Sequence, residues 1–178
     1  TLFPYTTLFR SVVETLLDRV FDVAQATGAG CIGLAGGEID TATRMLGRPH
    51  EIRGTVIDGD KRGRTIGFPT ANVAVPDGMC IPADGVYAAV YRRPDGSEHA
   101  CAVNIGRRPT FYNDAQHSLI EAHLIDFSGD IYGEVAAVQF LAFLRSEKRF
   151  AGIDELKTQL VSDIEHARSA VLARRGSL

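Results

Sequence analysis

The sequence predicts a mainly β fold, an antiparallel barrel of about six short strands followed by a long helix. Between residues 51 and 144, short apolar runs alternate with turn-forming residues, a pattern typical of small β-barrels. Runs of this length and spacing favour antiparallel strands over βαβ units. Near residue 153 the apolar spacing changes from the strand period to the helical period, which predicts one long helix after the last strand.

Turn-forming residues set the limits of the strands. Pro76-Asp77-Gly78 and Ser128-Gly129-Asp130 each separate two apolar runs. Arg93-Pro94-Asp95-Gly96 indicates a hairpin, with glycine where the backbone needs a left-handed conformation. The six expected strands are 52–57, 68–75, 86–91, 99–105, 119–126 and 134–144.

Three helices are expected outside these strands. The C-terminal one runs from Ile153 to Arg174, with Lys157 and Asp163 facing outward. Its apolar stripe consists of Leu156, Leu160, Ile164, Ala167 and Val171. A short helix from Ile39 to Leu46 ends at Gly47. Residues 12–26 repeat apolar residues at helical spacing and predict a further helix.

The composition describes an ordinary globular protein. The chain has 178 residues, 45% of them hydrophobic and 23% charged, with a net charge of −3. It is not basic enough to indicate nucleic-acid binding, and it has no apolar run of the ~20 residues needed to span a bilayer. Its cysteines are odd in number and lack Cys-x-x-Cys spacing, which argues against disulfides and zinc and fits the cytoplasm.

A glycine-rich stretch before the second expected strand is the first candidate for a binding site. Gly59, Gly63 and Gly67 recur at every fourth position, interleaved with basic residues. Glycine lets the backbone approach a ligand closely, so that N–H groups can line an anion site. The basic residues Lys61, Arg62 and Arg64 would suit a polyphosphate such as that of ATP. The alternative is that this stretch is only a solvated turn.

Two polar residues follow the glycines and are candidate metal ligands. Thr70 and Asn72 are two positions apart, so on an extended strand they point to the same face. Neutral oxygen ligands suit Mg²⁺ when phosphate oxygens supply the negative charge. The stretch is neither a Walker A loop nor the Gly-x-Gly-x-x-Gly of a dinucleotide-binding fold.

Five ordered blocks of sequence resemble the riboflavin kinase family, whose bacterial members usually form the C-terminal half of a bifunctional riboflavin kinase/FAD synthetase. The blocks are the glycine stretch with Gly67-Phe68-Pro69-Thr70-Ala71-Asn72, then Gly85-Val86-Tyr87, Asn104-Ile105-Gly106-Arg107-Arg108-Pro109-Thr110-Phe111, Glu121-Ala122-His123-Leu124-Ile125-Asp126-Phe127, and Tyr132-Gly133 with Leu144-Arg145. The resemblance covers roughly residues 47–173. It implies a six-stranded Greek-key barrel that phosphorylates riboflavin with ATP and Mg²⁺ to give FMN and ADP.

The resemblance also implies roles for single residues. Glu121 matches the family's catalytic glutamate and would accept a proton from the ribityl hydroxyl; the alternative is an ordinary surface glutamate. Phe68 belongs to the block that binds ATP. Arg108 would hold a phosphate or the flavin, or is a plain surface arginine. Arg145 and Phe150 lie at a corner that the family places near the flavin.

The resemblance implies a layout of three parts. Residues 1–11 resemble the translation of a sequencing-library adapter, residues 12–46 are a helical remnant of a missing adenylyltransferase domain, and residues 47–178 are the kinase. We therefore expect no FAD synthesis. The protein is expected to be a monomer, with self-association through the 12–26 helix as the alternative. A flavin- and nucleotide-binding barrel without turnover is the competing function.

Overall fold

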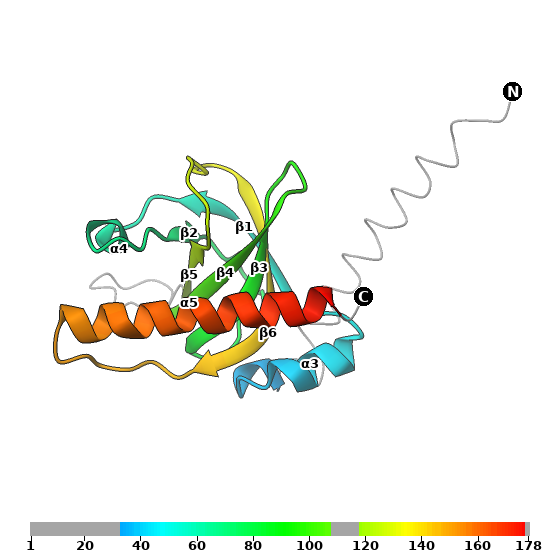
Figure 1. Ribbon diagram of the computed structural model, residues 1–178. Helices are drawn as coiled ribbons and strands as arrows, with labels where there is room; N and C mark the ends of the chain where they lie inside the picture. Colours follow the sequence, from blue (N-terminus) through cyan, green and yellow to red (C-terminus); the bar gives the residue numbers. More distant parts are fainter. Residues whose placement is uncertain (1–32, 108–117, 177–178) are drawn as a thin grey trace, which may run out of the picture.

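The structure, a computed structural model, describes residues 33–107 and 118–176. Figure 1 shows a β-barrel with one long helix lying across its outer face. In chain order the elements are α3 (Ile39–Leu46), β1 (Glu51–Ile57), α4 (Arg62–Thr65), β2 (Ala71–Val73), β3 (Gly85–Arg92), β4 (Glu98–Arg107), β5 (Ser118–Leu124), β6 (Val135–Arg145) and α5 (Ile153–Arg175). The predicted helix 12–26 and residues 1–11 before it lie outside the residues that the structure describes.

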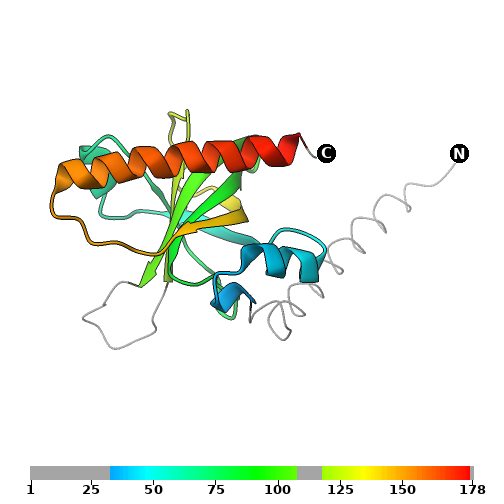
Figure 2. The ribbon, with the colours of Figure 1, turned by 60° about the horizontal axis from the view of Figure 1, so that its bottom comes forward.

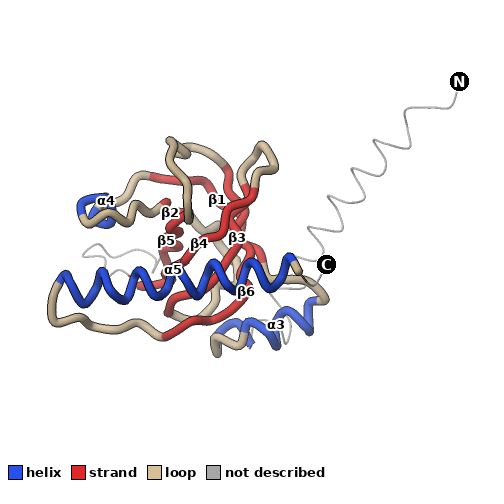
Figure 3. The backbone as a smooth tube through the Cα atoms, viewed as in Figure 1, coloured by secondary structure: helices blue, strands red, loops and turns tan. Residues whose placement is uncertain are grey.

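The six strands close into a barrel in the order β1-β2-β5-β4-β3-β6, and all neighbouring strands are antiparallel. β3, β4 and β5 lie side by side in sequence order, and β6 returns to pair with β3, which is Greek-key order. Figure 3 shows these strands in red, with α5 as the long blue helix outside them. The predicted fold class is confirmed.

Side chains along each strand point alternately into the barrel and to its outer face, where several polar residues lie. Val103 and Ile105 on β4 are fully buried in the core. Ile120 and Ala122 on β5 are fully buried as well. Because successive side chains of a strand point to opposite faces, the residues between them face outward. The outward positions of β4 and β5 include Asn104 and Glu121. The candidate site therefore lies on the outside of the barrel.

The second strand is shorter than predicted. Only Ala71–Val73 of the expected 68–75 pair as a strand. The N–H of Phe68 donates to the carbonyl of Gly63 at 2.8 Å, which draws residues before Thr70 into the glycine loop. The other predicted strands and the Ile39–Leu46 and C-terminal helices agree with the structure to within about two residues at each end.

α5 packs against the outward face of β3, β4 and β6. The strands present small residues there, among them Ala88, Ala102 and Ala142, which let the helix approach closely. Ala167 and Val171 of the predicted apolar stripe are buried. The prediction that Asp163 faces outward is wrong: it is 3% exposed, because it pairs with Arg145 on β6.

The segment before β1 is part of the barrel's core. Leu34, Ile39 and Ala42 are almost completely buried and belong to the same cluster as the barrel interior. α3 ends at Gly47, whose φ of 67° lies in the left-handed region that favours glycine. Figure 2 shows α3 at the end of the barrel away from α4.

His50 connects this segment to the loop before β3. Its ring is fully buried and stacks on Phe140, with ring centroids 6.0 Å apart. Its Nε2 lies 2.8 Å from the carbonyl oxygen of Cys80. Burial lowers the pKa of His50 from 6.5 to about 4, and the hydrogen bond to Cys80 offsets only part of that effect. His50 is therefore neutral in the folded protein at neutral pH.

Acidification from pH 7 to pH 5 is expected to destabilise the fold through His50. The unfolded chain takes up a proton below pH 6.5, whereas folded His50 does so only near pH 4. Proton uptake by the unfolded chain therefore lowers the free energy of unfolding as the pH falls, by about 2 kcal/mol between pH 7 and pH 5. Urea unfolding of wild type and His50→Gln at pH 7 and at pH 5 measures this change in the free energy of unfolding. An equal loss of stability in both proteins would contradict the assignment.

No helix in residues 33–107 and 118–176 is long and apolar enough to cross a membrane. In the same two ranges, no group of three or more His, Cys, Asp or Glu side chains lies close enough together to hold a metal ion.

Candidate active site

The glycine loop between β1 and β2 folds back on itself. Its middle forms the single turn α4, and Lys61 before this turn has a φ of 55°, in the left-handed region. The backbone N–H groups of residues 66–68 donate to carbonyl groups inside the loop. These donors are used by the loop itself, so a phosphate would have to be bound by N–H groups earlier in the loop.

Two of the predicted glycines are required by close packing. A Cβ on Gly63 would lie 2.2 Å from the carbonyl oxygen of Phe68. A Cβ on Gly59 would lie 2.0 Å from the side-chain nitrogen of Asn72. Gly59 therefore makes room for the amide of Asn72, which is only 6% exposed. Glycine at position 59 and asparagine at position 72 form one packing unit.

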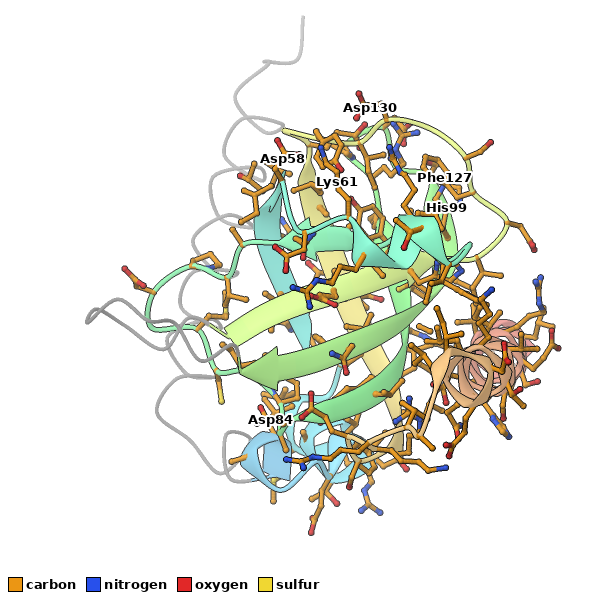
Figure 4. The ribbon with its side chains drawn as sticks, turned by 90° about the vertical axis from the view of Figure 1, so that its left-hand side faces the viewer. Asp58, Lys61, Asp84, His99, Phe127 and Asp130 are labelled. Atoms are coloured by element: carbon orange, nitrogen blue, oxygen red, sulfur yellow. The ribbon has the colours of Figure 1, made fainter. Side chains whose placement is uncertain are left out.

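The three basic residues of the loop point in different directions. Lys61 pairs with Asp58 at 3.0 Å and lies over the ring of Tyr132, whereas Arg62 is 3.6 Å from Asp60. Figure 4 shows Asp58, Lys61 and Asp130 at one end of the barrel and Asp84 at the other. All three basic residues are exposed and two of them are paired with aspartates, so the loop presents an open rim rather than a closed phosphate cage.

A polar row crosses three adjacent strands of the outer face. Asn72 on β2 is the direct cross-strand partner of Glu121 on β5, and Glu121 is the direct partner of Asn104 on β4. Directly opposite residues in antiparallel strands have Cβ atoms about 4.5–5.5 Å apart. The strand register thus places a carboxylate between two carboxamides, beside the glycine loop.

Two residues of the row face a large cavity of about 810 Å³ between the barrel, the glycine loop and α5. Glu121 and Asn104 line its floor, while Leu156, Leu160 and Ile164 of α5 form an apolar wall. Arg62, Gly63, Phe68 and Thr70 line it on the loop side. Cavities of this size hold a ligand as large as a tricyclic ring system with a side chain.

A smaller cavity of about 250 Å³ also borders the loop, whereas a further cavity of about 580 Å³ lies away from it, between α3, β6 and α5. Arg64, Phe127 and Tyr132 contribute to the wall of the 250 Å³ cavity. Thr70 lies on the wall of both cavities that border the loop. The two cavities therefore share Thr70, the residue that was predicted as a metal ligand.

His123 supports the segment before Thr70. Its Nδ1 lies 2.7 Å from the carbonyl oxygen of Pro69, and its ring meets the ring of Phe68 edge to face. Since both contacts go to residues just before Thr70, His123 holds the loop on β5. These contacts give His123 a structural role in the loop.

The corner between β6 and α5 closes the far side of the large cavity. Arg145 donates to both carboxylate oxygens of Asp163, from Nε at 2.9 Å and from Nη2 at 2.7 Å. Its guanidinium also lies over the ring of Phe150, 5.8 Å from the centroid. Both predicted flavin-binding residues at this corner thus line the cavity, with the charge of Arg145 already paired.

Glycine on β4 lets this corner come close to the strand. A Cβ on Gly106 would lie 2.6 Å from Oε1 of Glu147, so the Glu147 carboxylate lies directly over the β4 backbone. Arg108, with Phe111 and Tyr112 of the same block, lies outside the described residues.

Comparison with known proteins decides the family. The model of the riboflavin kinase (flavokinase) family matches residues 46–171. This chain belongs to the riboflavin kinase family. The match includes the barrel, both cavities and α5 as far as Val171.

Curated relatives of the riboflavin kinase family are similar over the same region. The bifunctional riboflavin kinase/FMN adenylyltransferases of Listeria monocytogenes and Bacillus subtilis are 44% and 42% identical over 133 and 135 residues. The alignments cover 75% of this chain and 42% of each relative. The corresponding protein of Escherichia coli K12 is 41% identical over 76% of this chain and 42% of its own length. The chain thus spans less than half the length of these relatives.

A solved structure shares the fold of this riboflavin kinase family member. It is described as a macrolide-efflux protein from Streptococcus pneumoniae and has a TM-score of 0.73 and 35% identity. The match covers 78% of this chain and 45% of that one. The closed barrel with its covering helix is therefore present in an independently solved protein.

Two polar residues of the cavity were not singled out from the sequence. Asn104 was noted only as part of a sequence block, although the strand register makes it the neighbour of Glu121. Asp163 was assigned to the outer face of α5, although it holds Arg145. A signal for Asn104 exists in the sequence, since a polar residue lies between Val103 and Ile105 on a strand with an apolar inner face.

Proposed function

We propose that this chain is a riboflavin kinase, which transfers the γ-phosphoryl group of ATP to the terminal ribityl hydroxyl of riboflavin and gives FMN and ADP. The observation that carries the proposal is the position of Glu121, which lies on the floor of the large cavity beside the glycine loop, with Asn72 and Asn104 as its partners on the two neighbouring strands. Membership of the riboflavin kinase family and the names of the relatives support it. We further propose a monomer that acts in the cytoplasm, without nucleic-acid or membrane partners.

The two cavities suit the two substrates. The large cavity has an apolar wall from α5 and a polar floor, which matches an isoalloxazine ring with a polyol chain. Phe150 and Arg145 line the same cavity from the β6–α5 corner, and we propose that they contact the flavin. The small cavity, with Arg64 on its wall, and the exposed side chains of Lys61 and Arg62 beside it suit the phosphates of the nucleotide. Arg108 remains a predicted ligand of the flavin or a phosphate.

Thr70 and Asn72 fit a magnesium site that is completed by phosphate. Thr70 lies on the wall of both cavities, and the amide of Asn72 is held in place by the close approach of Gly59. Their oxygens are neutral, which suits Mg²⁺ only when phosphate oxygens supply the charge. When bound, Mg²⁺ would neutralise charge on the transferred phosphoryl group.

The protein's part in the reaction is to position the substrates and to move one proton. Glu121 accepts the proton of the ribityl hydroxyl while the hydroxyl oxygen attacks the γ-phosphorus and ADP leaves. The cavity walls hold the hydroxyl in line with the phosphate, which converts the encounter of two substrates into a reaction within one complex.

The proposal is tested by incubating the protein with riboflavin, ATP and Mg²⁺ and separating the flavins by chromatography. We expect FMN to accumulate with an equal amount of ADP and no FAD. Omission of ATP or addition of a chelator should abolish FMN formation. Riboflavin that is bound but not converted would contradict the kinase and support the binding barrel. FAD would contradict the expectation that this chain does not adenylylate FMN.

A further inference from the structure

Asp163 is a carboxylate on the wall of the large cavity, and it has no role in the proposal above. It is 3% exposed and lies on α5, among the residues that form the apolar wall. A buried carboxylate is costly unless it is paired and hydrogen-bonded, whereas an apolar residue would fill such a place without that cost. An acid at this position therefore points to a task other than packing.

The carboxylate of Asp163 holds the guanidinium of Arg145 in one orientation. Its Oδ1 accepts from Nε of Arg145 at 2.9 Å and from Nε2 of Gln159 at 3.0 Å, and its Oδ2 accepts from Nη2 of Arg145 at 2.7 Å. Nη1 of Arg145 donates to the carbonyl oxygen of Ser146 at 3.0 Å, and the guanidinium lies over the ring of Phe150. The orientation of Arg145 is thus fixed before any ligand binds.

Arg145 keeps hydrogen-bonding capacity after these contacts. A guanidinium has five N–H donors, and the bonds to Asp163 and Ser146 use three of them. Counted over the contacts within residues 33–107 and 118–176, one N–H on each terminal nitrogen remains for a ligand. The side chain lines the large cavity and is 20% exposed. The pair can therefore offer two fixed donors while the carboxylate offsets the charge of the arginine.

We propose that Asp163 is a positioning residue for the flavin: it fixes Arg145 so that the remaining N–H groups donate to the ring carbonyl oxygens of riboflavin bound against the apolar wall of α5. This inference rests on the proposed function, because it states how Arg145 recognises the substrate assigned to this cavity. Donors that are fixed before the ligand arrives lose less freedom on binding. The carboxylate also offsets the charge of the guanidinium, which suits a ring system without charge.

A purely structural role is the alternative, in which Asp163 only joins α5 to β6. A second ion pair between α5 and the barrel allows the two roles to be separated. Arg168 of α5 donates to the carboxylate of Asp126, which follows β5, and neither residue lines the large cavity. Loosening of α5 should show in variants of either pair, whereas positioning of Arg145 should show only in variants of Asp163.

The test measures the preference for a ring oxygen over sulfur, as the Kd of 2-thioriboflavin or 4-thioriboflavin divided by that of riboflavin. Fluorescence titration and competition without ATP give these constants. Sulfur is a weaker acceptor than a carbonyl oxygen, so wild type should prefer riboflavin to at least one analogue about tenfold, as expected for one hydrogen bond from a charged donor. In Asp163→Asn the preference should fall below about threefold. In the matched control Asp126→Asn it should stay as in wild type.

A double-mutant cycle adds a readout that loss of packing alone would not change. Arg145→Met should abolish the preference, and adding Asp163→Asn to it should have no further effect on the ratio, because the carboxylate acts through the arginine. Gln159→Leu removes only the hydrogen bond from Gln159 to Oδ1 of Asp163. It takes the place of Asp163→Asn if that protein does not fold, and it should lower the preference by about twofold or more.

A wild type that forms FMN, together with an unchanged preference in Asp163→Asn or in the variant that takes its place, would overturn the role of Asp163 and leave the kinase standing. An equal loss of preference in Asp126→Asn would overturn it too, since the effect would then come from loosening of α5. A wild type that does not bind riboflavin would overturn the proposed function and this inference together.

Discussion

Replacement of Glu121 by glutamine is expected to lower the turnover number for riboflavin phosphorylation by about 10²–10⁴-fold. Glutamine keeps the shape of the side chain between Asn72 and Asn104 but cannot accept the hydroxyl proton. The dissociation constant for riboflavin should change little, because the apolar wall of α5 is untouched. Steady-state kinetics and a fluorescence titration of riboflavin separate the two quantities.

The control for this substitution is Glu98→Gln. Glu98 begins β4 and pairs with Arg92 on the exposed surface, and it does not line either cavity. Its turnover should match that of wild type within about twofold, because exposed ion pairs contribute little. Turnover above about a tenth of wild type in Glu121→Gln would show that this carboxylate is not the base.

Replacement of Gly59 by alanine is expected to reduce turnover by about 100-fold, the size of effect that a displacement of about 1 Å can have in an active site. The added Cβ would lie 2.0 Å from the Asn72 amide nitrogen, which has to move. Since Asn72 is 6% exposed, its side chain has little space, and the predicted metal ligand would be displaced. Activity measured as a function of Mg²⁺ concentration should show a raised requirement for the metal.

A double-mutant cycle tests the reason for this effect. If Gly59 serves to make room for the amide, Gly59→Ala should have a much smaller effect in an Asn72→Ala background. Gly176→Ala is the matched control: this glycine has φ of −80°, and an added Cβ would make an ordinary contact of 3.7 Å. Additive effects of the two substitutions would show that the glycine acts independently of the amide.

The strands could be predicted because their signals are local. Alternating apolar residues and a glycine such as Gly96, whose φ is 84°, mark strands and turns without knowledge of the rest of the fold. Glu121 was identified differently, by its match to the catalytic glutamate of the riboflavin kinase family. The shortened β2 escaped prediction because Phe68 is held by a hydrogen bond to Gly63, and the strand pattern continues through it.

Features that depend on distant partners could not be predicted. Asp163 borders the apolar stripe of α5, and its partner Arg145 belongs to a strand 18 residues earlier. Helical spacing alone places such a residue at the edge of the exposed face, and only the packing of α5 on β6 buries it. Asn104 meets Glu121 through the register of β4 and β5, which no single strand pattern contains.

Closure of the barrel has a consequence for how the protein is made. β1, the first strand, pairs with β6, the last, and the hydrogen bond from Gln139 to Glu51 joins residues 88 positions apart. During synthesis the ring cannot close until β6 has left the ribosome, so the earlier strands wait with an unpaired edge. Slowing translation while β6 is still inside the ribosome should therefore increase aggregation of the nascent chain, whereas slowing release of the chain after β6 has emerged should not.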